Sequence, residues 1–129
     1  MTPRPAPQDL LRHRPPALCL DALATAAAGT LVCTARARAW TWATLLEGAA
    51  QTAGLLVGMQ PGGLGDDAVV AEYRDVRATR ETWDGDVRFT ARMDRRVQRF
   101  WRCVVEATAP DGAPLLSARV TLAPPGADA

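Results

Sequence analysis

The sequence predicts an α+β domain in which a long antiparallel sheet wraps around one central apolar helix. Two observations carry this prediction. Residues 44–58 have almost no polar face, which indicates a helix that other structure encloses. Several other segments alternate apolar and polar residues between turn residues, which is typical of antiparallel strands. A length of 129 residues suits one domain with one core.

The chain begins with a segment that favours neither helix nor sheet. Residues 1–8 contain three prolines, so we expect a flexible arm there. A helical turn ended by Pro15 and Pro16 is expected next, followed by a short strand over 18–23. A second strand starts at Gly29, and the alanines before it are expected to form the turn.

The central helix is predicted over residues 41–58. Thr41 and Thr44 are plausible caps, no proline interrupts the segment, and it is rich in Ala and Leu. The stretch "QPGGLGDD" then ends the helix and forms a loop.

Four further strands are expected to form a meander. Asp-Gly pairs in 82–86 and 110–114 supply turn residues. A sheet of this length with one apolar helix packs most simply by curling around the helix, which is the hotdog fold. The domain is predicted over 9–124, with a flexible tail at 125–129. The predicted strands cover about 68–80, 86–93, 97–108 and 115–122.

Composition excludes several classes of function. The formal net charge is only +1, so neither nucleic acid nor a membrane surface is an expected partner. Cys19, Cys33 and Cys103 lack the paired spacing of a metal or redox site, so we expect no metal and read them as small buried residues. No apolar run reaches the length of a membrane span, and we expect a cytoplasmic protein.

Two stretches, "LLRHRPPALCLDAL" and "LLEGAAQTAGLL", resemble the β-hydroxyacyl-(acyl carrier protein) dehydratases and dehydratase-like proteins of bacterial aryl-polyene and polyketide clusters. The resemblance implies that Glu47 is the helix acid of the catalytic pair and that Gln51, one turn later, orients it. Gly54 completes the family's spacing and is expected at the substrate site. No cofactor is implied, because the substrate is carried on the phosphopantetheine of an acyl carrier protein.

The sequence departs from the family where its catalytic histidine should lie. The family places this histidine in a loop just before the helix, but here the region reads "VCTARARAWTWATLLEG". Trp40 and Trp42 occupy the place where the family opens its substrate channel and are expected to contact substrate. The only histidine, His13, matches a position that is structural in the family. A homodimer would therefore lack the imidazole, whereas a heterodimer with a histidine-bearing homologous partner would complete one site.

An arginine-rich segment follows the helix. It is a candidate docking surface for an acidic acyl carrier protein, because guanidinium groups bind phosphate in bidentate fashion. The alternative is an ordinary solvated face of a hairpin. The arginines concerned are Arg88, Arg92, Arg95, Arg96 and Arg99.

Other interpretations of the helix acid remain open. Glu47 could instead interact with the helix dipole or pair with Arg38. The leading functional hypothesis is a catalytically incomplete dehydratase-like subunit acting on 3-hydroxyacyl-acyl carrier protein in fatty acid, polyene or polyketide synthesis. The alternatives are a hotdog thioesterase that uses Glu47 to activate water, and a non-catalytic acyl-binding scaffold.

Overall fold

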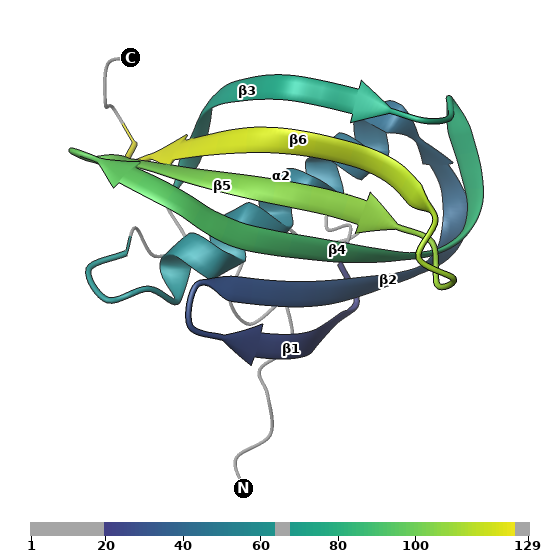
Figure 1. The fold of residues 1–129 in the computed structure, drawn as a ribbon, viewed down its shortest axis with the longest axis horizontal. Coiled ribbons are helices and arrows are strands. Elements are labelled where there is room, and N and C mark those ends of the chain that lie inside the picture. The colour runs from purple at the N-terminus through teal and green to yellow at the C-terminus, as the bar shows by residue number, and fades with distance from the viewer. Residues whose placement is uncertain (1–19, 64–67, 126–129) are drawn as a thin grey trace, which may run out of the picture.

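The structure is a computed structural model that describes residues 20–63 and 68–125. Six antiparallel strands form one sheet in the order β1-β2-β4-β5-β6-β3, and one helix packs inside it (Figure 1). The elements are β1 (Ala22–Ala27), β2 (Thr30–Thr41), α2 (Trp42–Gly58), β3 (Val69–Ala78), β4 (Thr82–Val97), β5 (Phe100–Thr108) and β6 (Pro114–Ala123).

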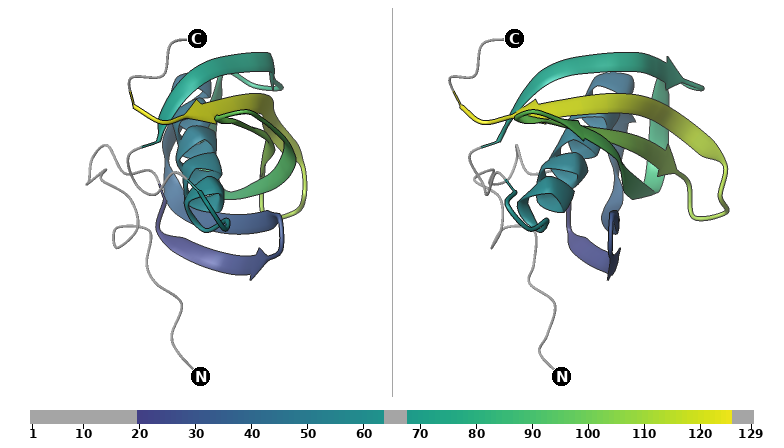
Figure 2. Two further views of the ribbon diagram at one scale, coloured as in Figure 1. Left: turned by 90° about the vertical axis from the view of Figure 1, so that its left-hand side faces the viewer. Right: turned by 60° about the vertical axis from the view of Figure 1, so that its left-hand side comes forward.

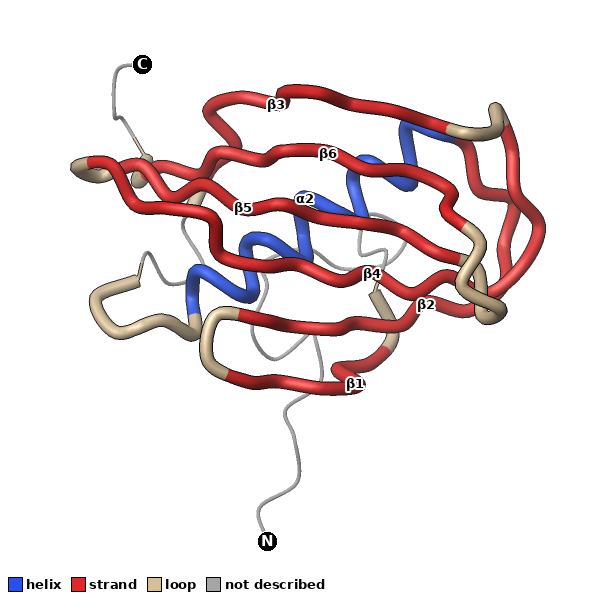
Figure 3. The backbone as a smooth tube through the Cα atoms, viewed as in Figure 1, coloured by secondary structure: helices blue, strands red, loops and turns tan. Residues whose placement is uncertain are grey.

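The sheet curls around α2, as the two turned views in Figure 2 show. The helix crosses the concave face diagonally, from the side of β3 at its first residues toward β2 at its last (Figure 3). Alternate residues of β4, β5 and β6 point toward it and are buried, including Phe89, Cys103 and Val120. The predicted architecture, a long antiparallel sheet around one apolar helix, is confirmed.

The helix begins where its caps predict. The backbone N–H of Thr44 donates to Thr41 Oγ1 over 3.2 Å, and the Thr41 N–H donates to Thr44 Oγ1 over 2.8 Å. This reciprocal capping box satisfies two of the N–H groups that a helix N-terminus leaves without partners. Because Thr41 is also the last residue of β2, the strand passes into α2 without a loop.

Helix and sheet approach closely at Gly48. A Cβ atom at this position would lie 2.4 Å from Cζ of Phe89, which is fully buried on β4. Glycine is therefore required at position 48 for α2 to pack this closely against the sheet. Cys33 and Cys103 belong to the same core, and burial raises the pKa of each thiol to about 12, as expected of small buried residues.

The predicted meander is wrong in one respect. The strand that follows the helix, β3, does not pair with β4 but lies at the far edge of the sheet beside β6. The strands β4, β5 and β6 therefore separate β3 from β2 in the sheet. The strands β4, β5 and β6 do form a meander.

Two of the three predicted turns need correction. Residues 82–86 lie inside β4 rather than in a turn, and β4 turns into β5 at Gln98, which has φ 55°. At the first hairpin, Ala26 and Ala27 still belong to β1, so the turn is confined to the residues beside Gly29, which has φ 73°. The other Asp-Gly turn is confirmed, because Gly112 there has φ 90°.

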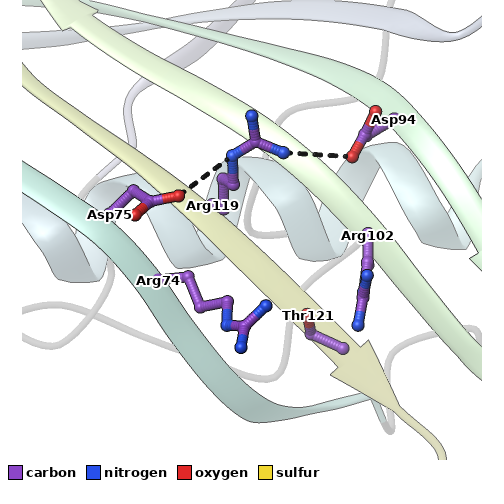
Figure 4. A pocket seen from close by; sticks show the side chains of 6 residues that line it. All are labelled: Arg74, Asp75, Asp94, Arg102, Arg119 and Thr121. Carbon is purple, nitrogen blue, oxygen red and sulfur yellow. Dashed lines mark hydrogen bonds and ion pairs between the residues drawn. The ribbon is translucent and has the colours of Figure 1, made fainter.

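The convex face of the sheet carries a network of opposite charges (Figure 4). Arg119 on β6 lies 3.3 Å from Asp75 of β3 and 3.5 Å from Asp94 of β4. Arg74 and Arg102 flank Thr121 beside them. Each pair is exposed and contributes little stability alone, so the network mainly keeps this face polar.

Several predictions fall outside the described residues. These are the arm at 1–8, the helical turn before Pro15, His13, Cys19 and the last residues of the tail. Within the described ranges, the helix lacks the length and hydropathy needed to cross a membrane.

Candidate functional site

The helix acid lies in the second turn of α2. Gln51, one turn later and 2% exposed, donates from Nε2 to Oε1 of Glu47 over 3.2 Å. No acidic residue occupies the first turn of the helix, where a carboxylate gains most from the helix dipole. The position of Glu47 is therefore not explained by the dipole, and its carboxylate is held by a buried amide.

Gly54 follows Glu47 by seven residues and Gln51 by three, so the three positions lie along one side of the helix. A Cβ atom at Gly54 would meet no described atom within 4 Å. Among the described residues, the space beside Gly54 is therefore open, in contrast to the side where Gly48 contacts Phe89. The predicted substrate-site glycine borders that space.

The two glycines of α2 give a matched test of the packing. We expect Gly48→Ala to destabilise the fold by about 1–3 kcal/mol, because its Cβ would overlap the Phe89 ring. Gly54→Ala should leave stability unchanged or raise it by up to about 1 kcal/mol, since Ala favours helix and the space is open. Urea unfolding of both variants measures the difference, and equal destabilisation would contradict this packing.

The two tryptophans predicted to contact substrate lie in different surroundings. Trp40 is fully buried, packs edge-on against Phe89 with ring centroids 5.9 Å apart, and donates from Nε1 to the Gly85 carbonyl over 3.1 Å. Trp42, the first residue of α2, is 50% exposed. The structure therefore gives Trp40 a packing role, and a substrate contact at either residue stays a prediction.

The five arginines predicted to dock a carrier protein do not form one surface. Arg88 and Arg92 alternate with the buried residues of β4 and so lie on the convex face. A register shift between Met93 and Arg95 places Arg95, opposite Arg102, on the same face. Arg92 approaches Glu106 of β5, with Nη2 3.8 Å from Oε1.

The other two arginines are separated from this row. Arg96 lies opposite Trp101 and places its guanidinium 4.4 Å from that ring centroid, while Arg99 is in the turn between β4 and β5. Of the five, only the row Arg88, Arg92 and Arg95 shares one face, and a docking role for it stays a prediction.

The edge strand β3 adds a residue that sequence reasoning missed. Tyr73 pairs with Val120, which is buried, so Tyr73 lies on the face of β3 that looks toward the helix. Partial burial, and then the charge of Glu47, raise the pKa of its phenol. The sequence did not indicate that Tyr73 lies near Glu47, because β3 was expected beside β4 and not at the far edge of the sheet.

All ten residues of β3 are exposed. Its large apolar side chains, Val69, Val70, Tyr73 and Val76, are each 37–46% exposed. A row of this kind on an unpaired edge is a ready surface for another strand. The Glu47 site therefore lies next to an edge that suits a second subunit.

Comparison with solved structures identifies the architecture. A chain of the dehydratase heterocomplex ApeI:P from Xenorhabdus doucetiae superposes with a TM-score of 0.80 at 14% identity, over 96% of this chain and 93% of that one. The chain has the hotdog fold. No protein-family model matches the sequence, and no curated protein matches it either.

Hotdog thioesterases superpose less closely. A hypothetical thioesterase from Streptococcus pneumoniae, solved with coenzyme A, gives a TM-score of 0.65 at 16% identity, over 83% of this chain and 87% of that one. Thioesterase HI1161 from Haemophilus influenzae gives 0.66 at 11% identity, over 79% and 76%. These likenesses establish the fold shared by both groups of enzymes.

Proposed function

We propose that the chain is a dehydratase-like hotdog subunit that acts on 3-hydroxyacyl thioesters carried by an acyl carrier protein, together with a histidine-bearing homologous partner. The observation that carries this proposal is the Glu47 carboxylate in the second turn of the central helix, which the buried Gln51 holds by a hydrogen bond. The similarity to a dehydratase heterocomplex over 96% of the chain supports the same proposal.

The chemistry requires two proton-transfer groups. Removing water from a 3-hydroxyacyl thioester breaks the C2–H bond and the C3–O bond, so a base must take the C2 proton and an acid must protonate the leaving hydroxyl. Glu47 provides one of these groups and the partner's histidine the other. Gln51 fixes the carboxylate, so that its position is set before the substrate binds.

The partner is needed because this chain has no place for the histidine loop. The strand β2 ends at Thr41 and α2 begins at Trp42, so no residues intervene. The exposed edge of β3 offers the surface for association, and pairing there brings a second subunit beside Glu47. The arginine row on the convex face would receive the acidic carrier protein.

The product formed by the complex tests the proposal. We expect co-expressed chain and partner to convert 3-hydroxyacyl-acyl carrier protein into the 2-enoyl form, because the combined site holds both proton-transfer groups. Mass spectrometry of the carrier protein detects this as the loss of one water. The partner with its catalytic histidine replaced by alanine is the control.

Two other outcomes would overturn the proposal in favour of its alternatives. Release of the free acid and of unloaded carrier protein would identify a thioesterase, in which Glu47 activates water on the thioester. Binding of the loaded carrier protein without any chemical change would identify a non-catalytic scaffold.

A further inference from the structure

Tyr73 lies on the edge strand of the sheet, on the face that looks toward the helix. Its register partner Val120 points into the core, which places Tyr73 on the concave face, whereas its sequence neighbours Glu72 and Arg74 pair with each other on the convex face. The helix starts on the β3 side of the sheet and crosses away from it toward β2 (Figures 1 and 3). The phenol is thus the polar group that β3 presents toward α2.

The surroundings of the phenol favour its neutral form. Tyr73 is 38% exposed, so its ring is partly desolvated. Burial and the negative charge of Glu47 act in the same direction and raise the pKa of the phenol above its usual value. Tyr73 therefore keeps its proton at neutral pH and can donate a hydrogen bond.

We propose that Tyr73 belongs to the Glu47 site and donates a hydrogen bond to the 3-hydroxyl group of the bound acyl thioester. This inference rests on the proposed function, because it takes the substrate to be a 3-hydroxyacyl thioester. The 3-hydroxyl oxygen must lie against the acid that acts on it, and a donor on β3 would hold it there from the side opposite the helix. Tyr73 thereby selects hydroxylated over saturated acyl chains.

The proximity of the two side chains can be measured without any assay of activity. Tyr73 is the only tyrosine in the chain, so the absorbance of phenolate at 295 nm reports its titration alone. We expect Glu47→Gln to lower the titration midpoint, since the neighbouring charge is lost. Glu72→Gln is the matched control, because it removes a carboxylate from the opposite face of the same strand.

A larger shift of the Tyr73 titration midpoint in Glu47→Gln than in Glu72→Gln supports the proposal. Equal shifts, or no shift in either variant, would overturn it. Circular dichroism of the same samples must show a folded protein across the titrated range.

A ligand pair tests the predicted hydrogen bond. The ring of Tyr73 is labelled with ¹³C in this chain only, and the complex with unlabelled partner is titrated with 3-hydroxybutyryl or butyryl N-acetylcysteamine thioester. We expect the hydroxylated ligand to shift the labelled signal more strongly, since only it offers the 3-hydroxyl. The proposal fails if both ligands give the same shift or neither gives one.

The kinetics of dehydration by the complex with the Tyr73→Phe variant test the same role. Because this substitution removes one hydrogen bond and keeps the ring, kcat should fall about 10-fold with an unchanged melting temperature. Unchanged kcat and KM would overturn the role of Tyr73. If the wild-type complex does not dehydrate 3-hydroxyacyl thioesters at all, the proposed function fails. The phenol titration and the ligand titration of the ¹³C-labelled complex still decide whether Tyr73 shares a site with Glu47.

Discussion

Replacing Glu47 by glutamine should lower the dehydration rate of the complex about 10²–10⁴-fold, the usual contribution of a positioned acid or base. The amide is nearly isosteric with the carboxylate, so the helix, the fold and the association of subunits should persist. Gln51 can still pair with an amide oxygen at this position, which keeps the side chain oriented. The variant therefore removes the titrating group and little else.

The measurement combines a dehydration assay and a melting curve on the same preparations. Asp84→Asn is a suitable control, because this exposed carboxylate lies on β4 outside both the Glu47 site and the arginine row, and its loss should affect neither quantity. If Glu47 served only as a structural ion-pair partner, its replacement would cost at most about 1 kcal/mol of stability and leave turnover intact. Full activity with a lowered melting temperature would therefore contradict the catalytic assignment.

The isolated chain should dehydrate 3-hydroxyacyl thioesters at least about 10²-fold more slowly than the complex, because its site has only one of the two proton-transfer groups. The structural reason is the direct passage from β2 into α2, which leaves no loop to carry an imidazole. A dimer of identical chains would repeat this deficiency at both of its sites.

Parallel assays of the chain, the partner and their mixture measure this difference, with sedimentation to establish which species is present. Turnover by the homogeneous chain at the rate of the complex would refute the need for a partner. Loss of that turnover in His13→Ala would then show that the single histidine of the chain supplies the missing group.

Local signals in the sequence were sufficient to predict the helix. The expected range of 41–58 differs from the observed α2 only at the capping residue, because Thr41 and Thr44 determine where a helix can begin. The prediction that a sheet encloses the helix followed from the absence of a polar face on residues 44–58. These features depend on neighbouring residues along the chain, which a sequence displays directly.

The turn signals were less reliable, because the same residues serve another purpose in β4. The Asp86 carboxylate accepts the N–H of Ala37 over 2.7 Å, where β2 bulges opposite β4. Gly85 leaves room for the ring of Trp83, which lies 2.7 Å from the place of a Cβ atom. A glycine and an aspartate that serve within a strand are indistinguishable in sequence from those that close a hairpin.

The site was only partly predictable for a topological reason. Glu47 and Gln51 are one helical turn apart, so their contact follows from sequence spacing. Tyr73 reaches the same region only because β3 crosses to the far edge and pairs with β6. That pairing depends on how the helix lies across the sheet, which no local pattern in the sequence encodes.

The irregular backbone of β3 also bears on solubility. Its register slips between Val70 and Glu72 and again between Arg74 and Arg77, and Asp75 in the second bulge has φ 51°. A straight strand from an unrelated chain cannot hydrogen-bond continuously along such an edge, and the stacked ribbons of a fibril require uninterrupted pairing. The bulges thus restrict strand pairing at this apolar edge to strands of matching shape, and we expect them to protect the isolated chain from aggregation.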